Sequence, residues 1–244
     1  MMRPHVEHRP SPNHGERKGG PVDILLLHYT GMPDDEQALG WLCDPRSKVS
    51  SHYFVHADGR VFALVPESRR AWHAGASNWG GETDINSRSI GIEIANAGHP
   101  GGLPDYPDAQ IEALIGLCRE IVGRHPIPPR RVLAHSDVAP GRKLDPGERF
   151  SWARLAATGI GYWVEPAAIS DGAARRPGDS GEAVQALQQM LALYGYGIDV
   201  TCLFDQRTTD VVAAFQRHFR PERVDGIADR STIETLRKLL EALP

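Results

Sequence analysis

Hydrophobic and polar positions in the first part of the chain follow the periodicities of strands and helices in turn. Residues 22–30 are apolar on both faces, which is typical of a central strand covered on both sides. Residues 52–65 form two apolar-rich runs around Asp58-Gly59, and this pattern predicts a β-hairpin. Residues 89–95 alternate between isoleucines and other residues, which predicts a strand with one face in the core.

A long helix and a further strand follow. The helical pattern begins at Pro107, and its apolar stripe predicts a side that faces the core. That stripe consists of Ile111, Leu114, Ile115, Cys118, Ile121 and Val122. Prolines in residues 126–129 end the helix, and residues 131–135 return as a strand. Strands interleaved with helices predict an α/β fold, with a mixed central β-sheet flanked by helices.

The composition changes after Trp163. Residues 164–178 contain prolines and glycines among small residues, which is typical of a linker. Residues 179–244 then hold three helical segments of similar design, and they predict a second, small three-helix domain. We therefore divide the chain into an extended N-terminal arm (1–20), a first domain (21–163), the linker and the helical domain.

Each helical segment of the tail follows an aspartate. Asp179 with Glu182 resembles a capping box, and the later segments follow Asp205 and Asp229. The fragments ALQQML and AAFQRHF resemble a weak internal repeat, because each places a glutamine beside apolar residues on a helix. The tail has one histidine, His218, and no cluster of histidines with carboxylates. We expect it to bind rather than to catalyse, and to be separable from the first domain.

Charge and composition exclude several classes of protein. The formal net charge of -4 argues against a dedicated nucleic-acid binder, and the pairs Arg130-Arg131 and Arg175-Arg176 lack interleaved aromatics. No apolar run approaches the roughly 20 residues that span a bilayer, so we expect no transmembrane segment. Three widely spaced cysteines make neither a disulfide framework nor a cysteine-rich zinc site. Nothing in the pattern requires more than a monomer.

The N-terminal 20 residues are rich in charge, proline and glycine and contain no apolar stretch. They predict an extended arm in which His5, His8 and His14 are solvated, with a metal-binding tract as the alternative. The absence of a secretory signal predicts a cytoplasmic protein. A start codon further upstream would remove that argument, so a periplasmic or wall-associated address stays open.

Three candidate metal ligands lie at strand ends or just beyond them. His28 closes the run ILLLH, His135 closes RVLAH, and Asp145 lies in RKLDPG. Each histidine alone could be a hydrogen-bonded core residue. Together, two imidazoles and one carboxylate suit zinc and leave a fourth position for water, which is the arrangement of a hydrolytic rather than a structural site.

Two further charged residues are candidates for chemistry. Asp145 precedes a proline, which favours extended backbone, so Lys143 and Asp145 project to the same side; a surface ion pair between them is the alternative. Glu93 lies inside SIGIEIAN on the face opposite the isoleucines. A carboxylate among apolar residues has a raised pKa, which suits a general base and acid. The alternative is a salt bridge to an arginine such as Arg88.

Four stretches carry a resemblance to a known family. LLLHYT, SSHYFVHADGRVFALVPESRRAWHAG, NSRSIGIEIAN and VLAHSDVAPGRKLDPGERFSW resemble the zinc-dependent N-acetylmuramoyl-L-alanine amidases of type 2, whose fold is shared with peptidoglycan-recognition proteins. The match covers roughly residues 10–160, and it is nearest the bacterial amidases that also accept anhydro-muropeptides. The tail resembles the three-helix peptidoglycan-binding domain, with Cys202 where that module usually has glycine.

The resemblance implies a role for each matching position. It implies that His28, His135 and Asp145 hold one Zn²⁺ per chain, that Glu93 is the catalytic acid and base, and that Lys143 stabilises the transition state. It also implies a substrate groove, and the residues that we expect to line it are Tyr53, Trp72, His73, Ala74 and Asn86. Tyr53 and Trp72 could equally be ordinary core aromatics.

The implied function is hydrolysis of the amide between N-acetylmuramic acid, or its 1,6-anhydro form, and L-alanine of the stem peptide. The alternative is a peptidoglycan-recognition protein that binds without cleaving, but the complete ligand set favours catalysis. The sequence leaves the working substrate open. A wall-binding tail favours the polymer, whereas the missing export signal favours soluble fragments recycled in the cytoplasm.

Overall fold

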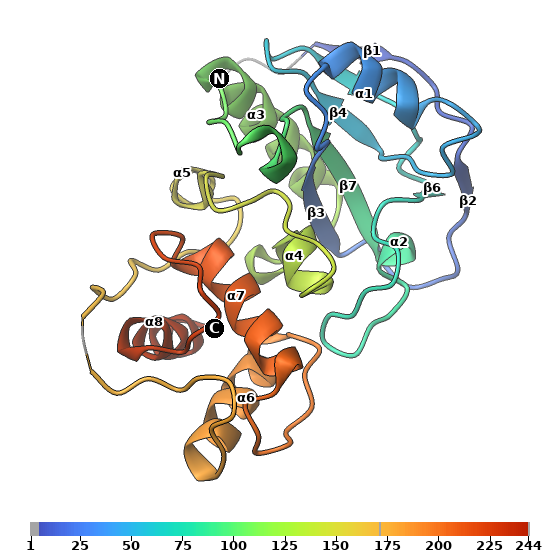
Figure 1. Cartoon of the computed structure of the whole chain (residues 1–244). Coiled ribbons are helices and arrows are strands. Elements are labelled where there is room, and N and C mark those ends of the chain that lie inside the picture. Colours follow the sequence, from blue (N-terminus) through green and yellow to red (C-terminus); the bar gives the residue numbers. More distant parts are fainter. Residues whose placement is uncertain (1–4, 171, 244) are drawn as a thin grey trace.

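The computed structural model describes residues 5–170 and 172–243, and its centre is a six-stranded sheet of order β1-β5-β4-β7-β3-β8 (Figure 1). The strands of this sheet are β1 Val6–His8, β3 Ile24–Tyr29, β4 Tyr53–Val55, β5 Val61–Ala63, β7 Ser89–Ile94 and β8 Val132–Ala134. β4 and β5 form the predicted hairpin and are antiparallel, while the other neighbouring pairs are parallel. The mixed sheet with flanking helices confirms the predicted α/β fold class.

One face of the sheet packs on the long helix. α3 spans Asp108–Arg124, as the stripe predicts, and lies behind the strands in Figure 1. Its apolar residues pack against Leu25 and Leu27 of β3 and the isoleucines of β7 in a fully buried cluster. Cys118 is 0% exposed and belongs to this cluster, which confirms its prediction as a core residue.

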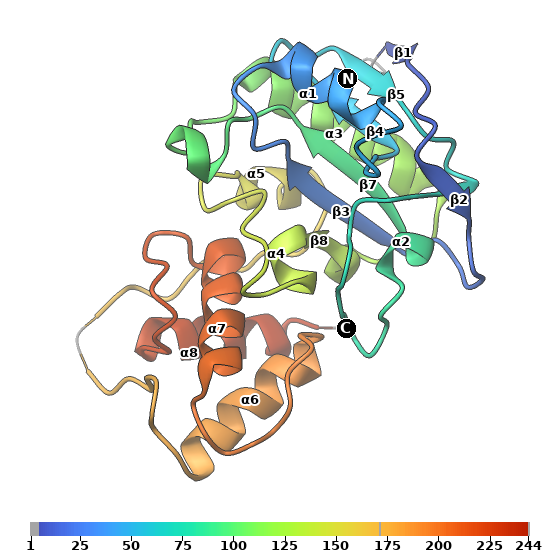
Figure 2. The same cartoon turned by 45° about the vertical axis from the view of Figure 1, so that its right-hand side comes forward.

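The opposite face of the sheet is covered in two places. Helix α1, Asp35–Leu42, packs on Phe54 and Phe62 over β4 and β5. The short helix α4, His135–Val138, follows β8 and lies over the other end of the sheet (Figure 2). In the parallel register of β3 and β7, His28 is the partner of Glu93. Partners in a register point to the same face, so both side chains enter the space between α1 and α4.

Short elements complete this part of the chain. They are β2 His14–Glu16, β6 Arg69–Ala71, α2 Ile85–Arg88, α5 Trp152–Ala156 and the 3-10 turns His99–Gly101 and Pro129–Arg131. Residues 5–20 are extended, as expected, but part of this segment is packed on the sheet region. β1 pairs with β5, β2 pairs with β6, and Ser11 and Asn13 between them are buried.

The C-terminal region consists of α6 Glu182–Tyr194, α7 Gln206–Phe219 and α8 Arg230–Glu241. Asp205 and Asp229 cap α7 and α8 by accepting from backbone N–H groups. The capping-box prediction at Asp179 is wrong, because the N-cap of α6 is Gly181 and no side chain caps it. In the described residues no helix is long and apolar enough to cross a membrane.

The internal repeat has a structural cause in its two buried glutamines. Gln188 and Gln216 each reach from a helix into the loop that follows, and each accepts backbone N–H groups there. Cys202 N–H donates to Gln188 Oε1 at 2.9 Å, and Gly226 N–H donates to Gln216 Oε1 at 2.9 Å. Cys202 has φ 61° and Gly226 has φ 71°. Cys202 therefore occupies a left-handed position that glycine fills in the second repeat.

This position gives a prediction about stability. Cys202→Gly should raise the free energy of unfolding by about 1 kcal/mol, because the left-handed conformation strains residues that have a Cβ. Cys202→Ala keeps a Cβ and should give no comparable gain. Urea unfolding of the three proteins compares them directly. A Gly variant less stable than the Ala variant would contradict the explanation.

The helical region shares its core with the sheet. Leu133, Val138 and Trp79 from the first part of the chain lie in one buried cluster with the apolar residues of α6, α7 and α8. Trp79 packs edge-on against Tyr196, with ring centroids 5.0 Å apart. Such a shared core argues against the expectation that the two regions separate cleanly.

A truncated chain that ends at Trp163 should therefore be less stable than the whole protein. Exposing the side chains that α6 and α7 cover should cost about 3–5 kcal/mol of unfolding free energy, at about 1.5 kcal/mol or more for each large apolar side chain. Denaturant unfolding followed by tryptophan fluorescence and circular dichroism measures this. If the truncated chain has the same free energy of unfolding as the sheet region of the whole protein, the two regions do not share a core.

Candidate metal centre and active site

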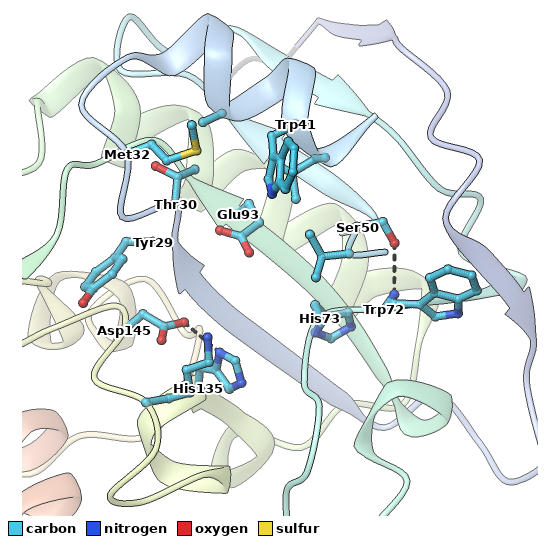
Figure 3. A pocket seen from close by; sticks show the side chains of 14 residues that line it. Tyr29, Thr30, Met32, Trp41, Ser50, Trp72, His73, Glu93, His135 and Asp145 are labelled. Atoms are coloured by element: carbon cyan, nitrogen blue, oxygen red, sulfur yellow. Dashed lines mark hydrogen bonds and ion pairs between the residues drawn. The ribbon is translucent and has the colours of Figure 1, made fainter. Parts of the chain in front are cut away.

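Three side chains meet where β3 and β8 end. His28 is the penultimate residue of β3. His135 begins α4 directly after β8, and Asp145 comes from the loop that follows α4 (Figure 3). His28 Nδ1 lies 2.8 Å from His135 Nδ1, and Asp145 Oδ2 lies 3.0 Å from the first and 2.9 Å from the second. The three ligand atoms thus form a small triangle, and the three residues that supply them are buried. The structure therefore brings together all three residues of the predicted set.

The hydrogen bonds of His135 orient its ring so that Nδ1 can bind a cation. Its Nε2 lies 3.0 Å from the carbonyl oxygen of Ala74, which can only accept, so this nitrogen carries the proton. In this tautomer Nδ1 presents its lone pair to the carboxylate of Asp145. Two acceptors at this distance need a proton or a metal ion between them. A carbonyl that fixes the tautomer of a histidine is the usual outer contact of a zinc ligand.

The pKa values of the ligands also suit metal binding. Burial, followed by the nearby His135, lowers the pKa of His28 to about 4, so His28 is neutral near pH 7. Burial opposes ionisation of Asp145, but His135 and His28 outweigh it and lower the pKa of this carboxyl. A neutral imidazole and an ionised carboxylate are the forms that coordinate zinc.

Glu93 is the unpaired acid of the site. Its Oε2 is buried and has no hydrogen-bond partner among the described residues. Burial, followed by the charge of Asp145, raises the pKa of Glu93 well above its ordinary range. The alternative partner is excluded, because Arg88 pairs with Asp23 and Glu82 instead. Glu93 points from β7 into the cavity beside the ligands, where a proton acceptor could reach a bound water (Figure 3).

Lys143 lines the same cavity as Glu93 and Asp145. The alternative interpretation of Lys143 is a surface ion pair with Asp145. In the described part of the chain no such ion pair is present. Its charge lowers the pKa of Glu93, against the larger effects of burial and of Asp145. An ammonium group in this place can stabilise negative charge that develops on a substrate oxygen.

His73 lies beside the ligand His28 and is held from several sides. Its Nδ1 is 3.0 Å from His28 Nε2, and Asn86 Oδ1 accepts the backbone N–H groups of His73 and Ala74. The ring packs on Gly91, where an added Cβ would lie 2.6 Å from ring atoms, so glycine is required there. Asn86 therefore shapes the loop that carries His73.

A cavity of about 320 Å³ joins these residues. Among the five predicted substrate contacts, Trp72 and His73 line it. Tyr53 instead donates its hydroxyl to Glu67 at 2.7 Å and packs against the sheet core. Ala74 and Asn86 are buried and do not line the cavity. Substrate contact by Tyr53, Ala74 and Asn86 stays a prediction.

Sequence reasoning missed part of the cavity wall. Tyr29, Met32, Trp41, Val49 and Ser50 line it as well. Tyr29 follows the ligand His28, so adjacency to the motif could have identified it. Trp41 is 47% exposed and stands on α1 above the opening (Figure 3). The sequence alone does not show where this helix packs, so an exposed tryptophan at position 41 could not be identified as a cavity residue from the sequence.

Comparison with protein families assigns both parts of the chain. Residues 18–148 match the N-acetylmuramoyl-L-alanine amidase family, and residues 180–236 match a peptidoglycan binding domain family. The chain is 40% identical over 234 residues to the N-acetylmuramoyl-L-alanine amidase AmiD of Escherichia coli, covering 90% of this chain and 83% of the relative. It is 34% identical to the 1,6-anhydro-N-acetylmuramyl-L-alanine amidase AmpD of Enterobacter cloacae, over 62% of this chain and 89% of the relative.

Solved structures agree. The complex of Escherichia coli AmiD with anhydro-N-acetylmuramic acid-L-Ala-D-gamma-Glu-L-Lys matches with a TM-score of 0.77 and 38% identity, over 96% of this chain and 92% of that one. AmpDh3 of Pseudomonas aeruginosa in complex with an anhydromuramic pentapeptide matches with a TM-score of 0.75 and 33% identity, over 97% and 96%. Both relatives cover the sheet and the helical region together.

Proposed function

The chain belongs to the N-acetylmuramoyl-L-alanine amidase family and hydrolyses the amide between N-acetylmuramic acid and L-alanine, and we propose that His28, His135 and Asp145 hold the zinc ion of this reaction. The observation that carries the proposal is the convergence of three ligand atoms beside a buried, unpaired carboxylate in one cavity. The family match and the amidase relatives confirm the enzymatic interpretation of the sequence over the alternative of a binding protein that does not cleave.

Glu93 and Lys143 account for the proton and charge movements of the reaction. When bound, zinc supplies Lewis-acid stabilisation and a water that is acidic enough to react near pH 7. Glu93 takes a proton from the attacking water, whose oxygen adds to the lactyl carbonyl carbon. The carboxyl of Glu93 then gives that proton to the alanine nitrogen as the carbon–nitrogen bond breaks. The products are a lactyl carboxylate and a stem peptide with a free amine.

We propose soluble anhydro-muropeptides as substrates of this site, in line with the compounds bound in the two related structures. The helical region is proposed to hold wall polymer near the cavity, in line with its family. The cytoplasmic address stays a prediction, and cell fractionation would test it.

Mass spectrometry of the products tests the assignment. The purified protein should convert an anhydro-muramyl tripeptide into the free tripeptide and anhydro-N-acetylmuramic acid. Purified sacculi, offered in parallel, test whether the polymer is also cut. Absence of free tripeptide from both substrates, with a zinc-loaded protein, would contradict the proposal.

A variant of Lys143 tests the oxyanion role. Lys143→Met keeps the length of the side chain and removes its charge. Because a preorganised donor acts most strongly in the transition state, kcat should fall about 100- to 1,000-fold while KM changes little. Lys143→Arg keeps the charge and serves as the control. A fall in substrate affinity with unchanged kcat would instead place Lys143 in ground-state binding.

A further inference from the structure

A buried carboxylate supports the turn that carries His135. Asp137 is 0% exposed, and its Oδ2 accepts the backbone N–H of Ala134 at 2.8 Å. Ala134 is the N-cap of α4, and His135 is the first residue of that helix. The hydrogen bond closes the turn at which the chain passes from β8 into α4. Asp137 therefore fixes the direction in which His135 leaves the backbone.

Both oxygens of this carboxylate are bound by the helical region. Tyr196 donates its hydroxyl to Asp137 Oδ1 at 2.7 Å, and His218 Nδ1 donates to Asp137 Oδ2 at 2.6 Å. Tyr196 and His218 are each 2% exposed. A carboxylate as deep as this one is costly unless hydrogen bonds satisfy it. The helical region thus supplies two side-chain donors to a group that belongs to the first part of the chain.

The ring of His218 is fixed in the orientation that this contact needs. Trp152 of α5 stacks on it with ring centroids 3.8 Å apart, and Phe219 stacks on it at 3.8 Å. α7 lies beside α4 in both views (Figure 1, Figure 2). The imidazole is therefore held from both parts of the chain with Nδ1 directed at Asp137.

A second path leads from the neighbouring residue of α7 to the cavity. Arg217 Nε donates to Glu148 Oε2 at 3.3 Å, and this oxygen lies 3.1 Å from His99 Nε2. His99 Nδ1 lies 2.9 Å from the hydroxyl of Tyr29, which lines the cavity and follows the ligand His28. Two adjacent residues of α7 are thus connected through side-chain contacts to Ala134, which precedes His135, and to Tyr29, which follows His28.

We propose that the helical region has a second role besides binding wall material: His218 and Tyr196 are positioning residues that hold the Asp137 turn, and through it the metal ligand His135, in place. This inference rests on the metal site proposed above. Through these two residues α7 affects metal affinity and turnover rather than the capture of polymer.

Zinc affinity and kinetics of the full-length chain test the role of His218. His218→Leu removes the donor, and we expect zinc affinity to fall about 10- to 100-fold, with a similar fall in kcat and little change in KM, as for other outer contacts of metal ligands. The visible spectrum of the cobalt-substituted protein should change as well, since it reports ligand geometry. His218→Asn keeps an N–H donor at the atom that corresponds to Nδ1, so zinc affinity should recover to within about threefold of wild type.

A matched control separates positioning from loss of stability. Gln216 is also buried in α7, but its side chain binds Asp225, Ile227 and Thr232 within the helical region. Gln216→Met should lower stability and leave zinc affinity and the cobalt spectrum unchanged. The proposal is overturned if His218→Leu behaves as Gln216→Met does, or if His218→Asn behaves as His218→Leu does.

Tyr196→Phe provides a milder variant in case His218→Leu does not fold. It removes one hydroxyl group and should lower zinc affinity several-fold. Unchanged zinc affinity would overturn the proposal. Failure of the underlying metal site gives a different result. A wild-type chain that hydrolyses its substrate without binding zinc would overturn the metal site and this inference together.

Discussion

His135→Ala is expected to lose its zinc and to hydrolyse anhydro-muropeptides about 1,000-fold more slowly, or not measurably. A site of three protein ligands cannot lose one and keep both its geometry and its affinity, and the metal supplies most of the activation of water. His28→Ala and Asp145→Ala should behave in the same way. Zinc content by elemental analysis and tripeptide release, measured on the same preparations, give the two readouts.

Folding should largely survive this change, because the sheet core is apolar and separate from the metal ligands. His56 makes its contacts with acidic residues away from the cavity, so His56→Ala is the matched histidine control. It should keep one zinc per chain and normal turnover. Stoichiometric zinc in the His135→Ala protein would contradict the ligand assignment.

Glu93→Gln is expected to keep zinc and substrate binding but to lose about 100- to 10,000-fold in kcat. General acid and base catalysis contributes an effect of this size, and the amide of glutamine fills the same space without accepting the proton. Single-turnover measurements on the zinc-loaded variant separate this loss from loss of metal. Near-normal turnover would mean that another group moves the proton, and His73, which contacts His28, would be the next candidate.

The pH profile of the wild-type enzyme gives a second check on Glu93. Burial raises the pKa of its carboxyl above the ordinary value of 4.5. The base acts in its ionised form, so kcat/KM should fall as pH falls through this raised pKa, and the acid limb should lie above pH 4.5. The limb should be absent from the residual activity of Glu93→Gln. An unchanged acid limb in that variant would assign it to another group.

Much of the site could be predicted from the sequence because its signals are local. An apolar run that ends in histidine, and a carboxylate on the polar face of an alternating strand, identify His28, His135 and Glu93 as unusual. The parallel register that makes His28 and Glu93 partners was not predicted and comes from the structure alone. The family resemblance then supplied the roles that spacing alone left open.

Contacts between distant segments could not be predicted in this way. His218 and Asp137 are separated by 81 residues, and nothing in the sequence around either residue indicates the other. The tail has the periodicity of an independent module, yet its buried residues form one cluster with Leu133 and Val138. Periodicity predicts which face of a helix is buried but not which surface covers it. The same limit applies to Trp41, whose place above the cavity depends on how α1 packs.

Stoichiometric reconstitution of the metal-free wild-type enzyme tests the central claim most directly. The protein is stripped with a chelator, and tripeptide release from an anhydro-muramyl tripeptide is measured as zinc is added back. Activity should be absent at first, rise linearly and reach its plateau at one zinc per chain. Full activity in the metal-free protein, or a plateau that requires two zinc ions per chain, would contradict a single His28–His135–Asp145 centre.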